Sequence, residues 1–256
     1  MSGSAAGGRG RYDSIGLGYR AVRRPDPRIA RQIRAAIGDA ASVVNVGAGS
    51  GSYEPRDVLT VAVEPSPVMI AQRGPATAPV VRGTAEALPF DELGFDVAMA
   101  VHTVHHWADP MAGLAEMRRV SRRQVVLTWD PVFRVQRFWF ARDYLPQALH
   151  RERTLATVTT VVAALGPTAL VEPILLPADC ADGFYGAYWA RPDAYLDPSV
   201  RAAISVLALA DPALVADAVR RLEADLRSGA WAERNAELLG LASFDAGYRL
   251  VIAGAP

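Results

Sequence analysis

The sequence predicts an α/β fold in which a mostly parallel sheet carries helices on both faces. Short β-branched runs alternate with helical patterns up to about residue 130, and such alternation is typical of a parallel sheet covered on both sides. In addition, 51% of the 256 residues are hydrophobic, which is enough to fill one large core and argues against a disordered or fibrous chain. We therefore expect one globular domain.

Five strands are expected in the first half of the chain. The first, residues 42–46, is a β-branched run that leads directly into glycines, as in a buried strand followed by a sharp turn. The other runs of this kind are residues 59–63, 79–81, 95–101 and 124–128.

A helix is expected ahead of the first strand, over residues 27–37. Ile29, Ile33 and Ile37 recur there at four-residue spacing, which predicts one apolar helix face, and Gly38 follows as a helix end. Four more helices are expected, over residues 67–72, 110–120, 151–165 and 212–227. The second and fourth of these begin at a proline preceded by aspartate, a favoured N-cap arrangement.

The second half of the chain is more helical and contains two strand candidates. Residues 170–175 and 248–252 have strand-like composition and would extend the sheet. Residues 177–208 mix proline, glycine and aromatic residues, as an inserted cap does. No internal repeat or low-complexity linker is found, so a separate second domain is not expected.

Charge and cysteine usage exclude several classes of protein. Basic and acidic residues balance at 27 each, which excludes the broad basic footprint of a typical nucleic-acid binder and gives little attraction to anionic membranes. The single Cys180 excludes an internal disulfide and a cysteine-based zinc site. Without a long apolar run or a signal-like N-terminus, the protein is expected in the cytoplasm.

A glycine-rich loop follows the first strand. The strand runs straight into Gly47, Gly49 and Gly51, and Glu64 closes the next strand. Glycine permits the positive φ of a tight turn and lets a ligand lie against bare backbone. An acidic side chain at the end of the second strand can accept both hydroxyls of a ribose. These residues predict a nucleoside site at the carboxyl ends of the strands.

The loop chemistry favours a nucleoside that has no phosphates. A dinucleotide site has the spacing G-x-G-x-x-G before a long helix, whereas this loop has G-x-G-x-G followed by Ser52, Tyr53 and Glu54. Glu54 would place a negative charge where phosphates bind. S-adenosylmethionine fits this loop better than a dinucleotide, and a glycine-rich turn without any ligand is the remaining alternative.

Four sequence segments occur together in a characteristic order. They are YDSIGLGY over residues 12–19 with RPDP over 24–27, NVGAGSG over 45–51, VEPS over 63–66, and GTAEALPF over 83–90 with FDV over 95–97. In this order and spacing the chain resembles the class I S-adenosylmethionine-dependent methyltransferases of the small-molecule type, the methyltransferase domain 11-like group. The similarity covers roughly residues 12–130, and residues 244–252 match more loosely.

The resemblance implies S-adenosylmethionine as the cofactor and gives a role to each matched position. Arg24 is expected at the methionine carboxylate, where a guanidinium is a suitable counter-charge, and Glu64 at the ribose hydroxyls. His102 is expected beside the sulfonium. The implied cofactor residues are Tyr12, Tyr19, Arg24, Asn45, Gly47, Ala48, Gly49, Gly51, Glu64, Pro65, Ser66, Met69, Thr84, Ala85, Glu86, Val101 and His102.

Two positions depart from the family pattern. Position 45 usually carries Asp or Glu, so Asn45 turns a charged contact near the methionine ammonium into a neutral one. Position 84 often carries Asp, whereas Thr84 offers only a hydroxyl to the adenine amine. Both changes concern the affinity for the cofactor more than its identity.

Three of the four histidines, His102, His105 and His106, fall within five residues just past the fourth strand. Methyl transfer needs an aligned nucleophile and, where the nucleophile carries a proton, a base. We expect His105 or His106 to be that base or to touch the acceptor. The alternative is that His106 packs a loop with Trp107. No metal is expected, because no nearby acidic residue completes a ligand set.

The acceptor pocket is expected to use aromatic residues after the fifth strand. The candidates are Trp129, Asp130, Phe133, Phe184, Tyr185, Tyr188 and Trp189. The last four have the spacing of one face of a short helix, which is also typical of ordinary core. Asp130 is either a polar anchor for the acceptor or the cap of a loop.

The expected fold is therefore a Rossmann-like, seven-stranded, mostly parallel sheet with a helical cap inserted in the C-terminal half. The expected divisions of this single domain are 1–38 (lid and first helix), 39–131 (cofactor-binding core), 132–243 (cap and later strands) and 244–256 (C-terminal strand). The expected function is methyl transfer to a small-molecule acceptor at oxygen, nitrogen or carbon in specialised metabolism, without nucleic-acid or membrane partners. The alternatives are a non-methylating cyclase, decarboxylase or regulator of the same fold, and an NAD-dependent oxidoreductase.

Overall fold

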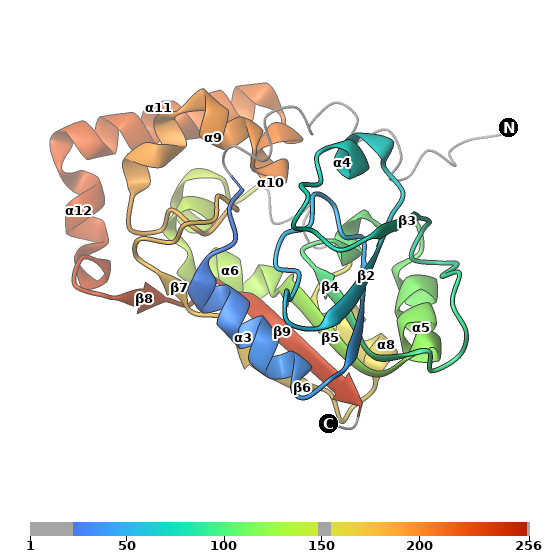
Figure 1. Cartoon of the computed structure of the whole chain (residues 1–256). Coiled ribbons are helices and arrows are strands. Elements are labelled where there is room, and N and C mark those ends of the chain that lie inside the picture. Colours follow the sequence, from blue (N-terminus) through green and yellow to red (C-terminus); the bar gives the residue numbers. More distant parts are fainter. Residues whose placement is uncertain (1–22, 148–154, 255–256) are drawn as a thin grey trace, which may run out of the picture.

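The computed structural model describes residues 23–147 and 155–254 of the chain. Within these residues, seven strands form one sheet in the order β3-β2-β1-β4-β5-β9-β6 (Figure 1). Neighbours from β3 to β5 pair in parallel, whereas β9 lies antiparallel between β5 and β6. The predicted seven-stranded, mostly parallel sheet is confirmed.

The strands lie close to their predicted positions. Their bounds are β1 Ser42–Val46, β2 Leu59–Glu64, β3 Val80–Arg82, β4 Phe95–Val101, β5 Ser121–Trp129, β6 Leu170–Pro173 and β9 Tyr248–Gly254. β5 is longer than the sequence predicts at both ends. The reason is pairing, because Ser121 lies opposite Phe95 of β4 and Trp129 lies opposite Tyr248 of β9.

The helices of the described residues are α3 Pro27–Ile37, α4 Pro67–Ala71, α5 Pro110–Val120, α6 Pro131–Arg137, α8 Val158–Leu165, α9 Pro198–Ala202, α10 Ser205–Ala208, α11 Pro212–Ser228 and α12 Ala230–Arg234. Aspartate side chains cap α3, α5, α6, α9 and α11, each ahead of a proline. Shorter elements are η1 Val104–His106, η2 Phe140–Tyr144, η3 Pro192–Leu196 and η4 Ala236–Leu238, and a ribbon of β7 Leu176–Pro177 with β8 Ser243–Phe244.

Two predicted helices need correction. Of the expected helix 151–165, the described part becomes helical only at Val158, because Thr157 has an extended backbone with φ −123° and ψ −168°. The aromatic segment 184–189 consists of turns rather than a short helix. There the Trp189 indole donates to the Leu176 carbonyl, and the Gly186 amide donates to the Tyr248 hydroxyl. These separate anchors hold the segment in turns.

Side chains of the central strands alternate between two hydrophobic cores. Val43 and Val97 point toward the core that contains α3, whereas Val44 and Ala98 point toward the core that contains α5 and α8. Both faces of the sheet are therefore covered, as a parallel sheet requires. Figure 1 shows α3 on one side of the sheet and α8 on the other.

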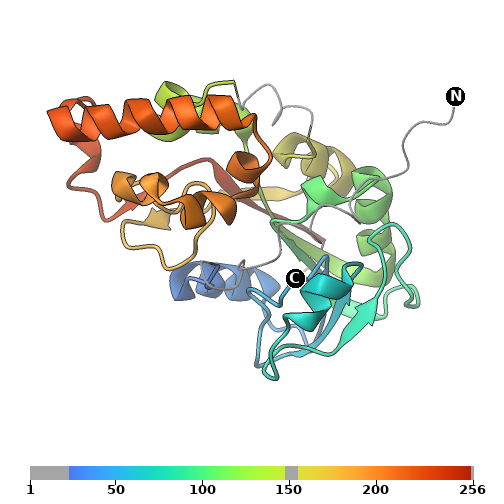
Figure 2. The ribbon, with the colours of Figure 1, turned by 90° about the horizontal axis from the view of Figure 1, so that it is seen from above.

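The later part of the chain builds a helical insertion beside the sheet. In Figures 1 and 2, α9, α10, α11 and α12 gather on one side of the molecule, while α4 and β3 lie on the other. The segment between β7 and η3 returns to the sheet and lies against α3 and the end of β4. No helix in the described part of the chain is long and apolar enough to cross a membrane.

Candidate cofactor site

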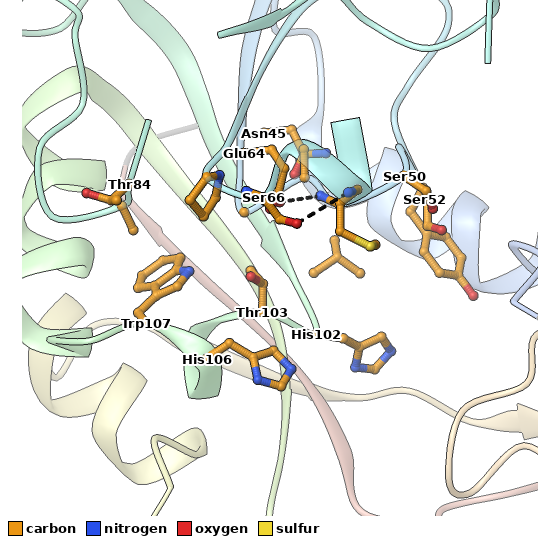
Figure 3. Close-up of a pocket in the computed structure, with 18 of the residues that line it drawn as sticks. Asn45, Ser50, Ser52, Glu64, Ser66, Thr84, His102, Thr103, His106 and Trp107 are labelled. Carbon is orange, nitrogen blue, oxygen red and sulfur yellow. Dashed lines mark hydrogen bonds between the residues drawn. The ribbon is translucent and has the colours of Figure 1, made fainter. Parts of the chain in front are cut away.

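A cavity of about 320 Å³ opens at the carboxyl ends of the parallel strands (Figure 3). Its walls come from the loops after β1, β2, β3 and β4 and from the segment before α3. Ligands bind at this edge in open α/β sheets, because the loops that diverge from the strand ends leave a crevice. The lining residues are Arg23, Asn45, Gly47, Ala48, Gly49, Ser50, Ser52, Tyr53, Glu64, Pro65, Ser66, Met69, Thr84, Ala85, Glu86, Val101, His102, Thr103, His106, Trp107 and Ala108.

The glycine loop comes very close to Thr103, in the segment after β4, at Gly47. This residue has φ +68°, and a Cβ placed there would lie 2.2 Å from Oγ1 of Thr103. Any other residue would therefore be strained in its backbone and would push into the wall. Gly49 also has a positive φ, and its amide points at Glu64. The loop thus presents bare backbone to the cavity.

Glu64 at the end of β2 is held by two backbone amides. Its Oε2 accepts from the Gly49 amide at 2.7 Å and its Oε1 accepts from the Ser66 amide at 2.9 Å. Burial raises the pKa of this carboxyl above its ordinary value, and the two amide hydrogen bonds oppose that shift. Each carboxylate oxygen can accept more than one hydrogen bond, so Glu64 can still receive ribose hydroxyls.

Asn45 is fixed by a buried ion pair behind the glycine loop. Its Nδ2 donates to Oε1 of Glu54 at 3.1 Å, and Nη2 of Arg73 lies 2.7 Å from the same oxygen. Nη1 of Arg73 donates to the Gly49 carbonyl at 3.1 Å. The negative charge of Glu54 is therefore paired with Arg73, and Glu54 is not among the cavity residues.

The wall opposite Glu64 is formed by the segment after β4, as Figure 3 shows for His102, Thr103, His106 and Trp107. His102 has φ +54°, an uncommon conformation for a residue with a side chain. Its amide donates to the Leu127 carbonyl at 3.0 Å, which anchors this conformation to β5. Strained residues of this kind cluster at functional sites.

The His102 ring is enclosed by aromatic and cationic side chains. Its centre lies 5.1 Å from the ring of Phe184 and 5.3 Å from that of Tyr248. Its Nε2 is buried and has no hydrogen-bond partner within the described structure. Burial, with Arg23, Arg134 and His106 nearby, lowers the pKa of His102 well below its ordinary value. His102 is therefore a neutral imidazole near neutral pH.

The two predicted base candidates occupy different places. His106 lines the cavity, and its amide closes a turn of η1 onto the Thr103 carbonyl at 2.8 Å. His105 is not among the cavity residues, and its ring packs 3.7 Å from that of His106 and 4.5 Å from that of Trp129. Only His106 of the pair is positioned to touch a ligand in this cavity.

Most of the predicted cofactor residues meet in this cavity. Those that line it are Asn45, Gly47, Ala48, Gly49, Glu64, Pro65, Ser66, Met69, Thr84, Ala85, Glu86, Val101 and His102. Gly51 is not among them and faces Thr77 instead. Arg24 is exposed, whereas its neighbour Arg23 lines the cavity and pairs with Asp182. Tyr12 and Tyr19 lie outside the described residues.

None of the predicted acceptor residues, all of them described, lines the cavity. Asp130 caps α6 by accepting from the amides of Val132 and Phe133, which is the role of a loop cap. The buried aromatic residues belong to the core; they are Trp129, Phe184, Tyr185, Tyr188 and Trp189. The Arg249 guanidinium lies over the Phe133 ring, with its carbon 4.5 Å from the ring centre. Phe184 comes nearest to the site, through its contact with His102.

Several cavity residues were not expected from the sequence. Ser50, Ser52, Thr103, Trp107 and Ala108 are sequence neighbours of recognised motifs, so their proximity to the motifs was a usable signal. Arg23 and Tyr53 also lie next to recognised motifs, but their contacts with Asp182, far away in the chain, could not be read from the sequence. Among the residues described, no three His, Cys, Asp or Glu side chains gather in a way that could hold a metal ion.

Comparisons with known proteins agree with this geometry. A family model described as a methyltransferase domain matches residues 44–128. A solved structure from Anabaena variabilis, assigned as a methyltransferase from an antibiotic biosynthesis pathway, is 30% identical, with 91% of this chain and 99% of that chain covered and a TM-score of 0.79. A comparison with curated proteins found no match.

Two further solved structures are more distant. A S-adenosylmethionine-dependent methyltransferase from Thermotoga maritima is 21% identical, with 64% of this chain and 80% of that chain covered and a TM-score of 0.47. Geranyl diphosphate C-methyltransferase from Streptomyces coelicolor is 14% identical, with 89% and 77% covered and a TM-score of 0.48.

Proposed function

Because the chain belongs to the class I S-adenosylmethionine-dependent methyltransferases, we propose that it methylates a small-molecule acceptor at the cavity described above. S-adenosylmethionine is its cofactor.

The observation that carries the residue assignment is the pairing of Glu64 with the glycine loop. Glu64 is held at the end of β2 by the Gly49 and Ser66 amides, where a ribose can reach its oxygens. Gly47 leaves room that a Cβ would fill, and His102 brings a buried, unpartnered Nε2 to the opposite wall. Arg23 is the one lysine or arginine among the described lining residues. A nucleoside without phosphates fits this set better than a dinucleotide.

Bound S-adenosylmethionine would supply an electrophilic methyl group on its sulfonium. An electron pair of the acceptor atom would form the new bond to the methyl carbon as the carbon–sulfur bond breaks, and the electron pair of that bond would stay on sulfur. We assign His106 to take the proton that a hydroxyl or amine acceptor loses, because it lines the cavity after β4. The His105 ring packs against the His106 ring at a tilt of 48° and would orient it.

A role in specialised metabolism and a cytoplasmic location remain part of this proposal. The balanced charge of the chain, 27 basic against 27 acidic residues, suits a small acceptor better than a nucleic acid. The Anabaena protein, which this chain covers almost completely, is assigned to an antibiotic pathway.

Methyl transfer from tritium-labelled S-adenosylmethionine into a panel of phenols, amines and carboxylic acids tests the proposal. We expect label in one small-molecule class and the release of an equal amount of S-adenosylhomocysteine. Label that enters tRNA or protein, and no small molecule, would contradict the proposed acceptor class. Calorimetric titration with S-adenosylhomocysteine tests the cofactor site independently of the acceptor.

A further inference from the structure

A buried ion pair joins the inserted segment to the wall of the cofactor cavity. Nε of Arg23 lies 2.7 Å from Oδ1 of Asp182, and its Nη2 lies 3.5 Å from Oδ2. The two side chains are 10% and 2% exposed, so water screens this pair little. Arg23 lines the cavity, whereas Asp182 lies behind it in the segment between β7 and η3.

The same carboxylate also holds a second residue of the cavity wall. The Tyr53 hydroxyl donates to Oδ2 of Asp182 at 2.8 Å, and the Gly183 amide donates to Oδ1 at 2.7 Å. Tyr53, just after the glycine loop, has φ +62°, which is an uncommon backbone conformation for a residue with a side chain. Asp182 thus reaches the segment before α3 through Arg23 and the glycine loop through Tyr53.

Neighbouring contacts keep the segment around Asp182 in place. Oδ2 of Asp26 accepts from the Ala181 amide at 2.9 Å. Arg28 bridges Asp26 at 2.8 Å and Asp179 at 2.6 Å. The segment 179–182 is therefore fastened to the residues that precede and begin α3, so the position of Asp182 does not depend on one bond alone.

The charge at Arg23 matches one group of the cofactor. Among the described lining residues Arg23 carries the one permanent positive charge, whereas Glu64 and Glu86 are acidic. S-adenosylmethionine has a single carboxylate, and guanidinium–carboxylate pairing is strong and geometrically specific. A guanidinium has five N–H donors in a planar fork, so one arginine can bind two carboxylates at once.

We propose that Asp182 is a positioning residue for the cofactor: it holds Arg23 in the cavity wall, where the guanidinium pairs with the carboxylate of S-adenosylmethionine. This assignment rests on the cofactor site described above and adds the inserted segment to it. Without Asp182, the flexible arginine side chain would have to be ordered by the ligand itself, which costs binding free energy.

Binding of two ligands distinguishes a role of Asp182 in positioning Arg23 from a general role in stabilising the fold. S-adenosylhomocysteine has the amino-acid carboxylate, whereas 5′-methylthioadenosine has the same nucleoside and thioether sulfur but no amino-acid part. Calorimetric titration of both ligands is carried out with the wild type, Asp182→Asn and Arg23→Gln. Arg24→Gln is the matched control, because Arg24 is the exposed neighbour of Arg23.

Asp182→Asn and Arg23→Gln are each expected to weaken S-adenosylhomocysteine about tenfold and to change 5′-methylthioadenosine by less than about twofold. Arg24→Gln is expected to leave both affinities as they are. The double variant Asp182→Asn with Arg23→Gln is expected to bind S-adenosylhomocysteine no more weakly than Arg23→Gln alone. Both substitutions act on the same contact, that of Arg23 with the ligand carboxylate.

Equal weakening of both ligands by Asp182→Asn, or no weakening of either, would overturn the proposal. If Asp182→Asn fails to fold, Tyr53→Phe and Arg23→Gln still decide the question. Tyr53→Phe removes one donor from Asp182 and should cause a smaller loss that is again confined to S-adenosylhomocysteine. Wild-type protein that bound neither ligand would instead refute the cofactor site, and this proposal with it.

Discussion

The side-chain amide of Asn45 donates a hydrogen bond to Oε1 of Glu54 at 3.1 Å, and Glu54 is itself paired with Arg73. Asn45 lines the cavity, whereas Glu54 and Arg73 lie behind it with 5% of each side chain exposed. At position 45 of β1, where the family usually has an acidic residue, this chain thus places a neutral amide in the wall of the cavity. A carboxylate held by an arginine lies directly behind that amide.

Asn45→Asp is expected to destabilise the protein even though it restores the usual family residue. The new carboxylate would face Glu54 in a buried site with one arginine for two negative charges, which costs about 3 kcal/mol of unfolding free energy. Urea unfolding measures this loss. The double variant Asn45→Asp with Glu54→Gln keeps one charge of each sign and should regain most of the stability. A single variant as stable as the wild type would contradict the prediction.

Gly47→Ala is expected to abolish tight cofactor binding. The alanine would need φ +68° and would place its Cβ 2.2 Å from Thr103 Oγ1. We expect a loss of at least about tenfold in affinity for S-adenosylhomocysteine, with a stability loss of about 2 kcal/mol. Gly166→Ala is the matched control, since Gly166 has φ +104° but nothing within 4 Å of a Cβ. Similar affinities for the two variants would show that the close approach does not matter.

His106→Ala is expected to lower kcat by about a hundredfold or more if a hydroxyl or amine is methylated, because a positioned base contributes about that much. His105→Ala should have a smaller effect, since His105 does not line the cavity and its ring packs against that of His106. The affinity for S-adenosylhomocysteine should change by less than about twofold in both variants. An unchanged kcat for His106→Ala would show that neither histidine is the base and that both only pack the loop.

His102 is expected to make the protein less stable in mild acid. Burial, with Arg23, Arg134 and His106 nearby, lowers its pKa in the folded state, while the unfolded chain titrates near 6.5. Below about pH 6.5 the unfolded state therefore binds more protons, and the unfolding free energy falls by about 1.4 kcal/mol per pH unit from this residue. The loss grows until the pH reaches the folded pKa and stays constant below that pH.

The variant His102→Asn tests this pH dependence. Asparagine tolerates the positive φ at this position better than most residues and does not titrate. Urea unfolding of both proteins is followed between about pH 7.5 and about pH 5.5. The variant should show a shallower loss of stability, and parallel curves would mean that His102 is not the group responsible. Glu64, whose pKa is raised by burial, is present in both proteins and cancels in the comparison.

Local sequence patterns were sufficient for most of the sheet and for the helices around it. The predicted strands 42–46 and 95–101 and the helices 27–37 and 110–120 have the same bounds in the structure. In these segments periodicity, caps and glycines all favour the same element, so no distant contact was needed to define it. The aromatic segment 184–189 differs, because distant carbonyl and hydroxyl partners hold it in turns.

The motif residues of the site were predictable for the same reason. Gly47 and His102 each follow a strand directly and Glu64 ends one, and the ends of parallel strands meet at one edge of the sheet. Arg23 and Asp182 were not predictable, because 159 positions separate them and neither belongs to a motif. The resemblance assigned Arg24 to the methionine carboxylate, whereas Arg23 is the arginine that lines the cavity and pairs with the buried Asp182.

The sequence by itself therefore determined the class of fold, the family and the nucleoside-binding edge, since these depend on periodicity and on residues next to strand ends. Only the tertiary structure decided which arginine faces the cavity, which histidine lines it, and that the charge of Glu54 is paired with Arg73. Such choices depend on which distant groups are buried together, because a buried charge needs a partner and takes it from wherever the fold brings one.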